Sequence, residues 1–140
     1  MKKMVIILLI VAVAGFVGCG KSDKSRVAGE AVAAAEAWLV LVDGEKYIES
    51  WDDAAPFFKG AVKSEQWIQM MQSVRKPLGK NVSRKYKSSQ SHTSMPGAPD
   101  GEYVVVRFKS SFENKKSAVE VVTPMLDKDG EWRVAGYFIK

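Results

Sequence analysis

The apolar residues of this chain change their spacing once, near residue 80, and this change limits the fold more than any other feature. Between residues 27 and 80, apolar side chains recur every three or four positions, which is the period of an amphipathic helix. After it, several stretches alternate apolar and polar side chains, which is the period of a half-buried strand. Helices followed by adjacent strands predict an α+β domain, with the helices packed on one face of an antiparallel sheet.

Three helices are expected in the first half. The first begins near Val27, is rich in alanine, and ends at the Asp43-Gly44 pair, where glycine provides a stop. The second and third are expected over residues 46–58 and 65–76. Each has a stripe of tryptophan and other apolar side chains that can face a common core.

About four strands are expected in the second half. Asp129-Gly130 is a strong signal for a two-residue hairpin turn, and a segment rich in proline and glycine, residues 95–101, predicts a loop. This order is similar to the nuclear-transport-factor-2-like (cystatin-like) folds, in which a curved sheet wraps a helix and leaves a hollow at its wide end. The expected strands cover residues 82–90, 102–112, 118–126 and 131–139.

A short leader precedes these elements. Two lysines, Lys2 and Lys3, are followed by an unbroken apolar run from Met4 to Val17. A membrane-spanning helix needs about 20 apolar residues, and a run of about 10–14 is typical of the central part of a signal peptide. We therefore expect residues 1–18 to be a leader that is removed.

The end of this run, Phe16-Val17-Gly18-Cys19, resembles the lipobox of bacterial lipoproteins. Val17, Gly18 and Cys19 match that motif, while Phe16 stands where leucine is usual. The resemblance implies transfer of diacylglycerol to the Cys19 thiol and cleavage between Gly18 and Cys19. The alternative is an ordinary leader followed by an incidental cysteine. With the lipobox, residues 19–26 become an acylated, flexible tether and residues 27–140 a single domain.

A lipid anchor predicts a location in the bacterial cell envelope. Gly20, and not aspartate, follows the cysteine, which is compatible with the outer membrane facing the periplasm if the host has two membranes. The expected partners are the membrane itself and, beyond it, envelope proteins or polyanions. The formal charge is +5, of which Lys2 and Lys3 belong to the leader. The remaining excess is small and does not indicate a nucleic-acid partner.

Three further segments of the sequence also indicate an envelope protein, because they resemble a known family. They are similar to small secreted bacterial proteins grouped as domain of unknown function 4019, and the likeness covers most of residues 30–139. The resemblance implies no catalytic residues, because that family has no agreed activity. The three segments are residues 34–51, with Trp38-Leu39 and Ser50-Trp51, residues 96–105, and residues 129–137.

Three residues in the first half of the sequence are candidates for a catalytic role. In cone-shaped enzymes of this fold type, a carboxylate inside the cone acts as a general base, and aromatic side chains shape the cavity. Asp43, Tyr47 and Asp52 are candidates for these roles if the helices turn them inward. The alternative is that Asp43 caps a turn, while Ser50 and Asp53 form a capping pair on a surface helix.

Other polar residues have simpler interpretations. The chain has a single histidine, His92, and a single cysteine, so a zinc site or a disulfide within the chain is not expected, nor is any cofactor. Arg84, Lys85 and Lys87 lie in an expected strand and can form a basic surface for envelope polyanions. The alternative is a solvated edge strand on which the lysines discourage pairing with another sheet.

Three functions follow from these features. The first is a non-catalytic binding or scaffold domain held at the envelope by its lipid. The second is a cone-fold enzyme, an isomerase or hydrolase of a small apolar substrate, which requires an enclosed cavity with a carboxylate at its floor. The third is adhesion to polyanions through the basic strand. The absence of a complete catalytic or metal motif favours the first.

Overall fold

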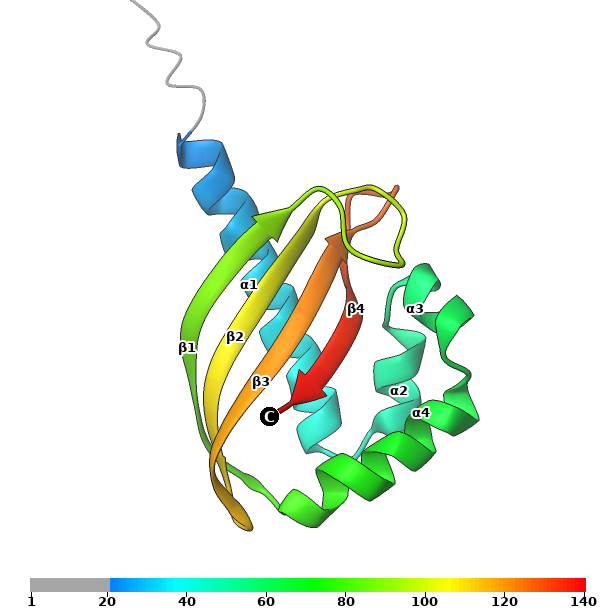
Figure 1. Ribbon diagram of the computed structural model, residues 1–140, viewed down its shortest axis with the longest axis vertical. Coiled ribbons are helices and arrows are strands. Elements are labelled where there is room, and N and C mark those ends of the chain that lie inside the picture. Colours follow the sequence, from blue (N-terminus) through cyan, green and yellow to red (C-terminus); the bar gives the residue numbers. More distant parts are fainter. Residues whose placement is uncertain (1–20) are drawn as a thin grey trace, which may run out of the picture.

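One long helix crosses the face of a four-stranded sheet in the computed structural model, which describes residues 21–140 (Figure 1). The strands are antiparallel and neighbouring in chain order. The predicted α+β class, with helices packed on an antiparallel sheet, is confirmed. The leader, Gly18 and Cys19 lie outside the described residues, so the lipid site stays a prediction. The helix is α1 (Lys21–Asp43), and the strands are β1 (Asn81–His92), β2 (Tyr103–Phe112), β3 (Lys115–Leu126) and β4 (Trp132–Ile139).

Helix α1 begins at Lys21, six residues before the expected start at Val27, so residues 21–26 are helical where a tether was expected. Acidic Asp23 lies in the first turn, where it complements the helix dipole, and Arg26 pairs with Glu30 one turn later at 3.4 Å. These contacts extend the helix that the alanine-rich segment nucleates. The helix contacts all four strands and covers the inner face of the sheet. Within residues 21–140, no helix is long and apolar enough to cross a membrane.

The second expected helix is divided in two. Helix α2 (Tyr47–Asp52) and helix α3 (Pro56–Ala61) are separated by a short turn that ends in the extended residue Ala55. Proline starts α3 instead of disturbing a longer helix, because the first turn needs no N–H from that position. The N–H of Ala55 donates to the carbonyl oxygen of Val134 at 2.8 Å, which attaches this segment to the edge of β4.

The third expected helix changes its winding along its length. It begins as α4 (Ser64–Met70), continues as a π-helical turn, η1 (Met71–Arg75), and ends as a 3₁₀ turn, η2 (Lys76–Leu78). A π turn holds more residues per turn than an α-helix, so it shifts which side chains face the core. Met71 and Arg75, the first and last residues of this turn, are buried. Gly79, with φ of 76°, ends the segment in a conformation that favours glycine.

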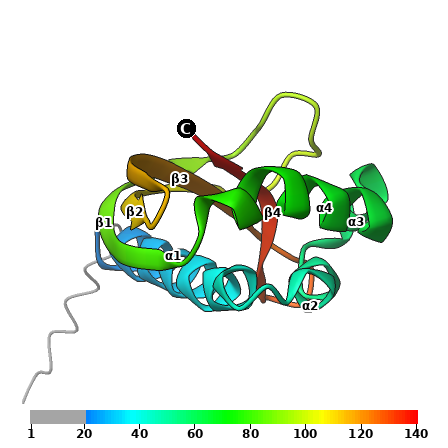
Figure 2. The ribbon, with the colours of Figure 1, turned by 90° about the horizontal axis from the view of Figure 1, so that it is seen from below.

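Aromatic side chains fill the interior between α1, α2, α4 and β4, elements that Figure 2 shows side by side. The ring centroids of Trp38 and Tyr137 lie 5.3 Å apart, and those of Phe58 and Trp67 lie 5.1 Å apart. The indole N–H of Trp38 donates to the carbonyl oxygen of Ser50 at 2.8 Å, and that of Trp67 donates to the Ser50 hydroxyl at 3.0 Å. Ser50 is therefore a buried core residue and not part of a surface cap.

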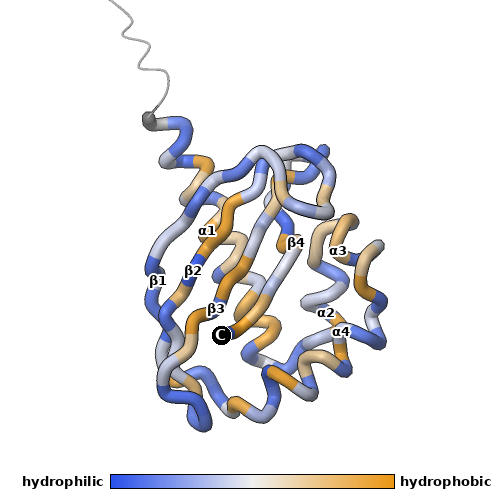
Figure 3. Tube along the Cα trace, in the orientation of Figure 1, coloured by the Kyte–Doolittle hydropathy of each residue, from blue (hydrophilic) through white to orange (hydrophobic). Residues whose placement is uncertain are grey.

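The two faces and the two edges of the sheet differ in what covers them. Side chains of β2 at alternate positions, including Val104, Val106 and Phe108, point towards α1 and are buried. Strand β1 is largely hydrophilic along its length, in contrast to β2 and β3 (Figure 3). The helices α2, α3 and α4 lie beside β4, so β1 forms the open edge (Figure 1).

Candidate functional site

A cluster of charged side chains lies between the C-terminal end of α1 and the inner face of the sheet. Asp43 is the last residue of α1, Arg84 comes from β1, and Glu120 comes from β3. The Arg84 guanidinium donates from Nη1 to Asp43 Oδ2 at 2.7 Å and from Nη2 to Asp43 Oδ1 at 2.9 Å. Its Nε donates to Glu120 Oε1 at 2.8 Å. One arginine therefore ties the long helix to two strands by charge-assisted hydrogen bonds.

Glu120 has no solvent exposure and accepts two further hydrogen bonds. The hydroxyl of Ser110, on β2, donates to Oε1 at 2.6 Å, and the hydroxyl of Tyr137, on β4, donates to Oε2 at 2.5 Å. Burial raises the pKa of the Tyr137 hydroxyl well above its ordinary value, and the charge and hydrogen bond of Glu120 add to this. The tyrosine therefore stays protonated as a donor.

Arg75 joins the cluster from the π-helical turn. Its Nη1 donates to the carbonyl oxygen of Gly79 at 2.6 Å, and its Nη2 donates to Asp43 Oδ1 at 3.2 Å. The guanidinium centre lies 4.5 Å from the centroid of the Phe112 ring, in the range of a cation–π contact. Its Nε is the buried side-chain polar atom without a hydrogen-bond partner in the described part of the chain.

Asp43 is a poor general base in this setting. Burial by itself would raise the pKa of its carboxyl group, but the hydrogen bonds and charges of Arg84 and Arg75 lower the pKa below its ordinary value. Both carboxylate oxygens already accept hydrogen bonds from arginine. A base needs a free oxygen within reach of a substrate proton and a pKa near the working pH. The cluster thus has the properties of a buried clamp between elements.

The structure brings two of the three catalytic candidates together. Asp43 and Tyr47 line one pocket of about 260 Å³ beside Arg75. Tyr47 is buried, and burial is the main cause that raises the pKa of its hydroxyl, with a contribution from the charge of Glu45. This pocket has the arginine-bound Asp43 carboxylate on its wall, so the pair has no free carboxylate base.

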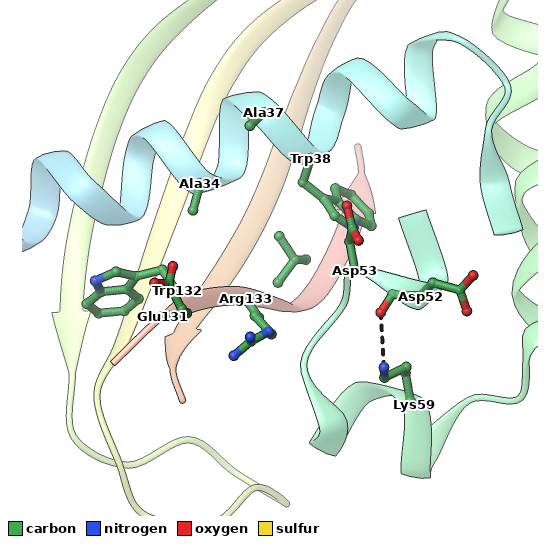
Figure 4. A pocket seen from close by; sticks show the side chains of 10 residues that line it. Ala34, Ala37, Trp38, Asp52, Asp53, Lys59, Glu131, Trp132 and Arg133 are labelled. Carbon is green, nitrogen blue, oxygen red and sulfur yellow. Dashed lines mark hydrogen bonds between the residues drawn. The ribbon is translucent and has the colours of Figure 1, made fainter. Parts of the chain in front are cut away.

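Asp52 lies elsewhere, in an open groove of about 640 Å³ between α1, α3 and the start of β4 (Figure 4). Ala34 and Ala37 form the α1 side of this groove. Asp52 is exposed, and its backbone oxygen accepts a hydrogen bond from Lys59 Nζ at 3.0 Å. The structure therefore does not join Asp52 to the site of Asp43 and Tyr47.

Arg133, which also lines this groove, is held by two carboxylates of the β3–β4 turn. It donates to Asp127 at 2.9 Å and to both carboxylate oxygens of Asp129 at 2.8 Å. The hydrogen bond from Arg133 is the main cause that lowers the pKa of Asp129 to about 2. The guanidinium of Arg133 is therefore held by the carboxylates of the turn.

His92 lines another pocket, of about 650 Å³, between the first turns of α1 and the starts of β2 and β4. Trp132 forms part of its wall, and two acidic side chains, Asp23 and Glu102, lie around it. Within residues 21–140 the structure contains no group of three or more His, Cys, Asp or Glu side chains that could hold a metal ion. The pocket is therefore a mixed polar and aromatic cleft.

The predicted basic surface is changed by the structure. Lys85 and Lys87 are exposed on β1. Arg84 points inward instead, with 15% of its side chain exposed, because it pairs with Asp43 and Glu120. Arg84 thus does not belong to a basic surface.

Four members of the cluster were not expected from the sequence: Arg75, Ser110, Glu120 and Tyr137. Glu120 carried a usable signal, because it occupies the same strand face as Ala118 and Val122, which are apolar and buried. A carboxylate at an inward position needs a cation from a neighbouring element. Arg75 carried a similar signal, because it follows the buried Trp67 and Met71 at intervals of four residues on one helix face.

One comparison with known proteins matches most of this domain. The profile of one family, described as "Protein of unknown function (DUF4019)", matches residues 34–137, which include the clamp, the aromatic cluster, the first three strands and most of β4. Searches of curated proteins and of solved structures found no match. The chain therefore belongs to the family of proteins of unknown function designated DUF4019.

Proposed function

We propose that this chain is a lipid-anchored lipoprotein of the bacterial cell envelope, and that its domain binds a partner without catalysing a reaction. The observation that carries the proposal is the arrangement of the leader. Lys2 and Lys3 precede an apolar run that is too short to span a bilayer, and the single thiol of the chain, Cys19, follows it directly after Gly18.

The position of α1 supports an anchor at this cysteine. The helix begins two residues after Cys19, and its first turns project beyond the sheet (Figure 1). Two extended residues span at most about 7 Å. An acylated Cys19 would therefore hold the domain close to the bilayer.

Binding without catalysis is supported by the state of the candidate residues. The carboxylate of Asp43 is committed to two arginines, and the exposed Asp52 lies apart from it. The place where an enclosed cavity would be expected is occupied by the aromatic cluster around Trp38 and Trp67. In the part of the chain that the structure describes, the pockets are open at the surface, as the partners of a binding module would require.

Labelling of cells with radioactive palmitate tests the anchor. We expect label on the wild-type protein and on the control variant Ser22→Ala, and none on Cys19→Ala. The wild type should also sediment with membranes and the Cys19→Ala variant should not. An unlabelled wild-type protein, or equal membrane association of wild type and Cys19→Ala, would contradict the proposal.

A further inference from the structure

The outer face of the sheet carries a group of cations that we call the basic face. These cations lie on the side of the sheet opposite to α1, around the middle of the strands. Lys85 on β1 lies directly opposite Lys109 on β2, and the next outward position of β2 is Arg107. The remaining members are Lys87, which lies in the bulge of β1, and Lys140, whose backbone pairs with Val119 of β3. The basic face is thus Lys85, Lys87, Arg107, Lys109 and Lys140.

Acidic side chains are missing from this face. The strand segments that form it are residues 83–88, 107–111, 117–121 and 137–140, and their single acidic residue is Glu120. Glu120 points to the other face, where Arg84 binds it. In the part of the chain that the structure describes, no ion pair involves a member of the basic face.

This arrangement does not help the fold. Like charges directly opposite each other on neighbouring strands destabilise a sheet, and Lys85 and Lys109 are such a pair. The lysines of β1 also disfavour pairing of its open edge with β1 of a second copy. A negatively charged partner would remove the repulsion between Lys85 and Lys109, so the charge pattern favours an anionic surface.

An exposed aromatic side chain lies within the basic face. Phe138 of β4 is 54% exposed, and its neighbour across the strands is Val121, which in turn lies opposite Arg107. Val121 itself is buried beneath these larger side chains. The face therefore offers cations from β1, β2 and the end of β4 together with one exposed apolar group.

We propose that the basic face docks on the surface of an anionic phospholipid bilayer, with its cations at the head-group phosphates and Phe138 at the interface. This rests on the envelope location proposed above. Four of the five cations are lysines, which act as point charges towards a diffuse anionic surface, whereas recognition of one defined anion favours the forked geometry of arginine. None of the pockets described above is lined by the basic face, which also favours a broad surface.

A basic face of this kind would complement a lipid anchor. One acyl chain binds a bilayer weakly, and a cluster of basic residues is a common second signal for stable attachment. The attraction also depends on lipid charge and falls with salt, because the charges are exposed. The contributions of the lipid anchor and of the basic face to membrane binding can therefore be measured separately.

The test uses the full chain and two matched triple variants. Lys85→Gln/Arg107→Gln/Lys109→Gln removes three charges from the basic face. Lys46→Gln/Lys63→Gln/Lys128→Gln removes the same number of charges from exposed lysines elsewhere on the domain. Partitioning is measured on vesicles of phosphatidylcholine and on vesicles of equal parts phosphatidylcholine and phosphatidylglycerol. The readout is the ratio of the two partition coefficients, compared between variants that carry the same leader or acyl chain, so that the contribution of this group is the same in each ratio.

We expect the face variant to lower this ratio about 10- to 100-fold and the control variant to change it little. The wild-type ratio should fall between low and physiological salt. The thermal midpoint of the face variant should equal or exceed that of the wild type, because the repulsion of Lys85 and Lys109 is gone, so lost binding cannot be lost folding.

Equal ratios for the two variants, or a wild-type ratio that does not respond to salt, would overturn the proposal. Tighter binding of the wild type to soluble polyglutamate than to anionic vesicles would assign the face to acidic proteins and also overturn it. Loss of palmitate labelling with an unchanged vesicle ratio would refute the anchor alone. An intact label with equal ratios would refute the basic face alone.

Discussion

Replacing Arg84 by methionine is the sharpest test of the buried clamp. Methionine has a similar length but no charge, so the change removes the guanidinium and keeps most of the packing. The wild-type side chain makes three charge-assisted hydrogen bonds at 2.7–2.9 Å to Asp43 and Glu120, and 15% of it is exposed. The substitution leaves Glu120, which has no solvent exposure, without its cation.

The expected loss of stability is large for a single residue. Removing one partner of a buried ion pair costs about 3–5 kcal/mol, because the remaining charge stays buried without compensation. Since Ser110 and Tyr137 still donate to Glu120 and Asp43 is only half-buried, we expect the lower end, about 3 kcal/mol. For a domain of this size, that lowers the thermal midpoint by about 10 °C.

Urea unfolding followed by tryptophan fluorescence measures this loss, because Trp38 and Trp67 lie in the core that the clamp adjoins. The matched control is Lys85→Met, the next residue on the same strand, whose side chain is exposed on the other face. An exposed substitution of this kind changes stability by about 0.5 kcal/mol or less. If Arg84→Met costs no more than Lys85→Met, the clamp does not hold α1 on the sheet and the reasoning is refuted.

Two further predictions concern the clamp and the aromatic cluster. The pKa of Asp43 is lowered in the folded state, so its contribution to stability is present above the unfolded value of 3.8 and is lost as the pH falls through the lower folded pKa. Urea titrations at several pH values should thus show the advantage of wild type over Asp43→Asn shrinking only in acid, and a constant difference would contradict this. Ser50→Ala removes the hydroxyl that accepts from the Trp67 indole, and should cost about 1–3 kcal/mol in the same assay, whereas the exposed Ser73→Ala should cost little. A cost for Ser50→Ala equal to that of Ser73→Ala would mean that water satisfies the indole.

The elements that depend on local pattern were predicted well. Strand β2 begins one residue after its expected start and ends at Phe112 as expected, because three consecutive valines, which favour strands, are followed by alternating apolar and polar residues. The division of residues 46–58 into α2 and α3 was missed. Ala55 is extended there because its N–H pairs with β4, a partner that is distant in sequence. Local propensity does not contain such a contact.

The candidate site was predicted only in part. Asp43 was selected as a carboxylate that could lie inside the cone, and the structure places it in one pocket with Tyr47. Its role as a base depended on a free oxygen, and Arg75 and Arg84 occupy both oxygens. Whether a carboxylate is free or paired is decided by side chains from other elements, which a linear pattern does not bring together.

By itself, the sequence determined the α+β class and the expectation of a leader that ends at Gly18, because helix and strand periods and a short apolar run are properties of neighbouring residues. The tertiary structure alone decided the pairing of polar side chains. Arg84 is 41 residues from Asp43 and 36 from Glu120, yet it bonds both. Burial in a medium that cannot solvate charge makes such pairing obligatory, and the fold determines which partners are within reach.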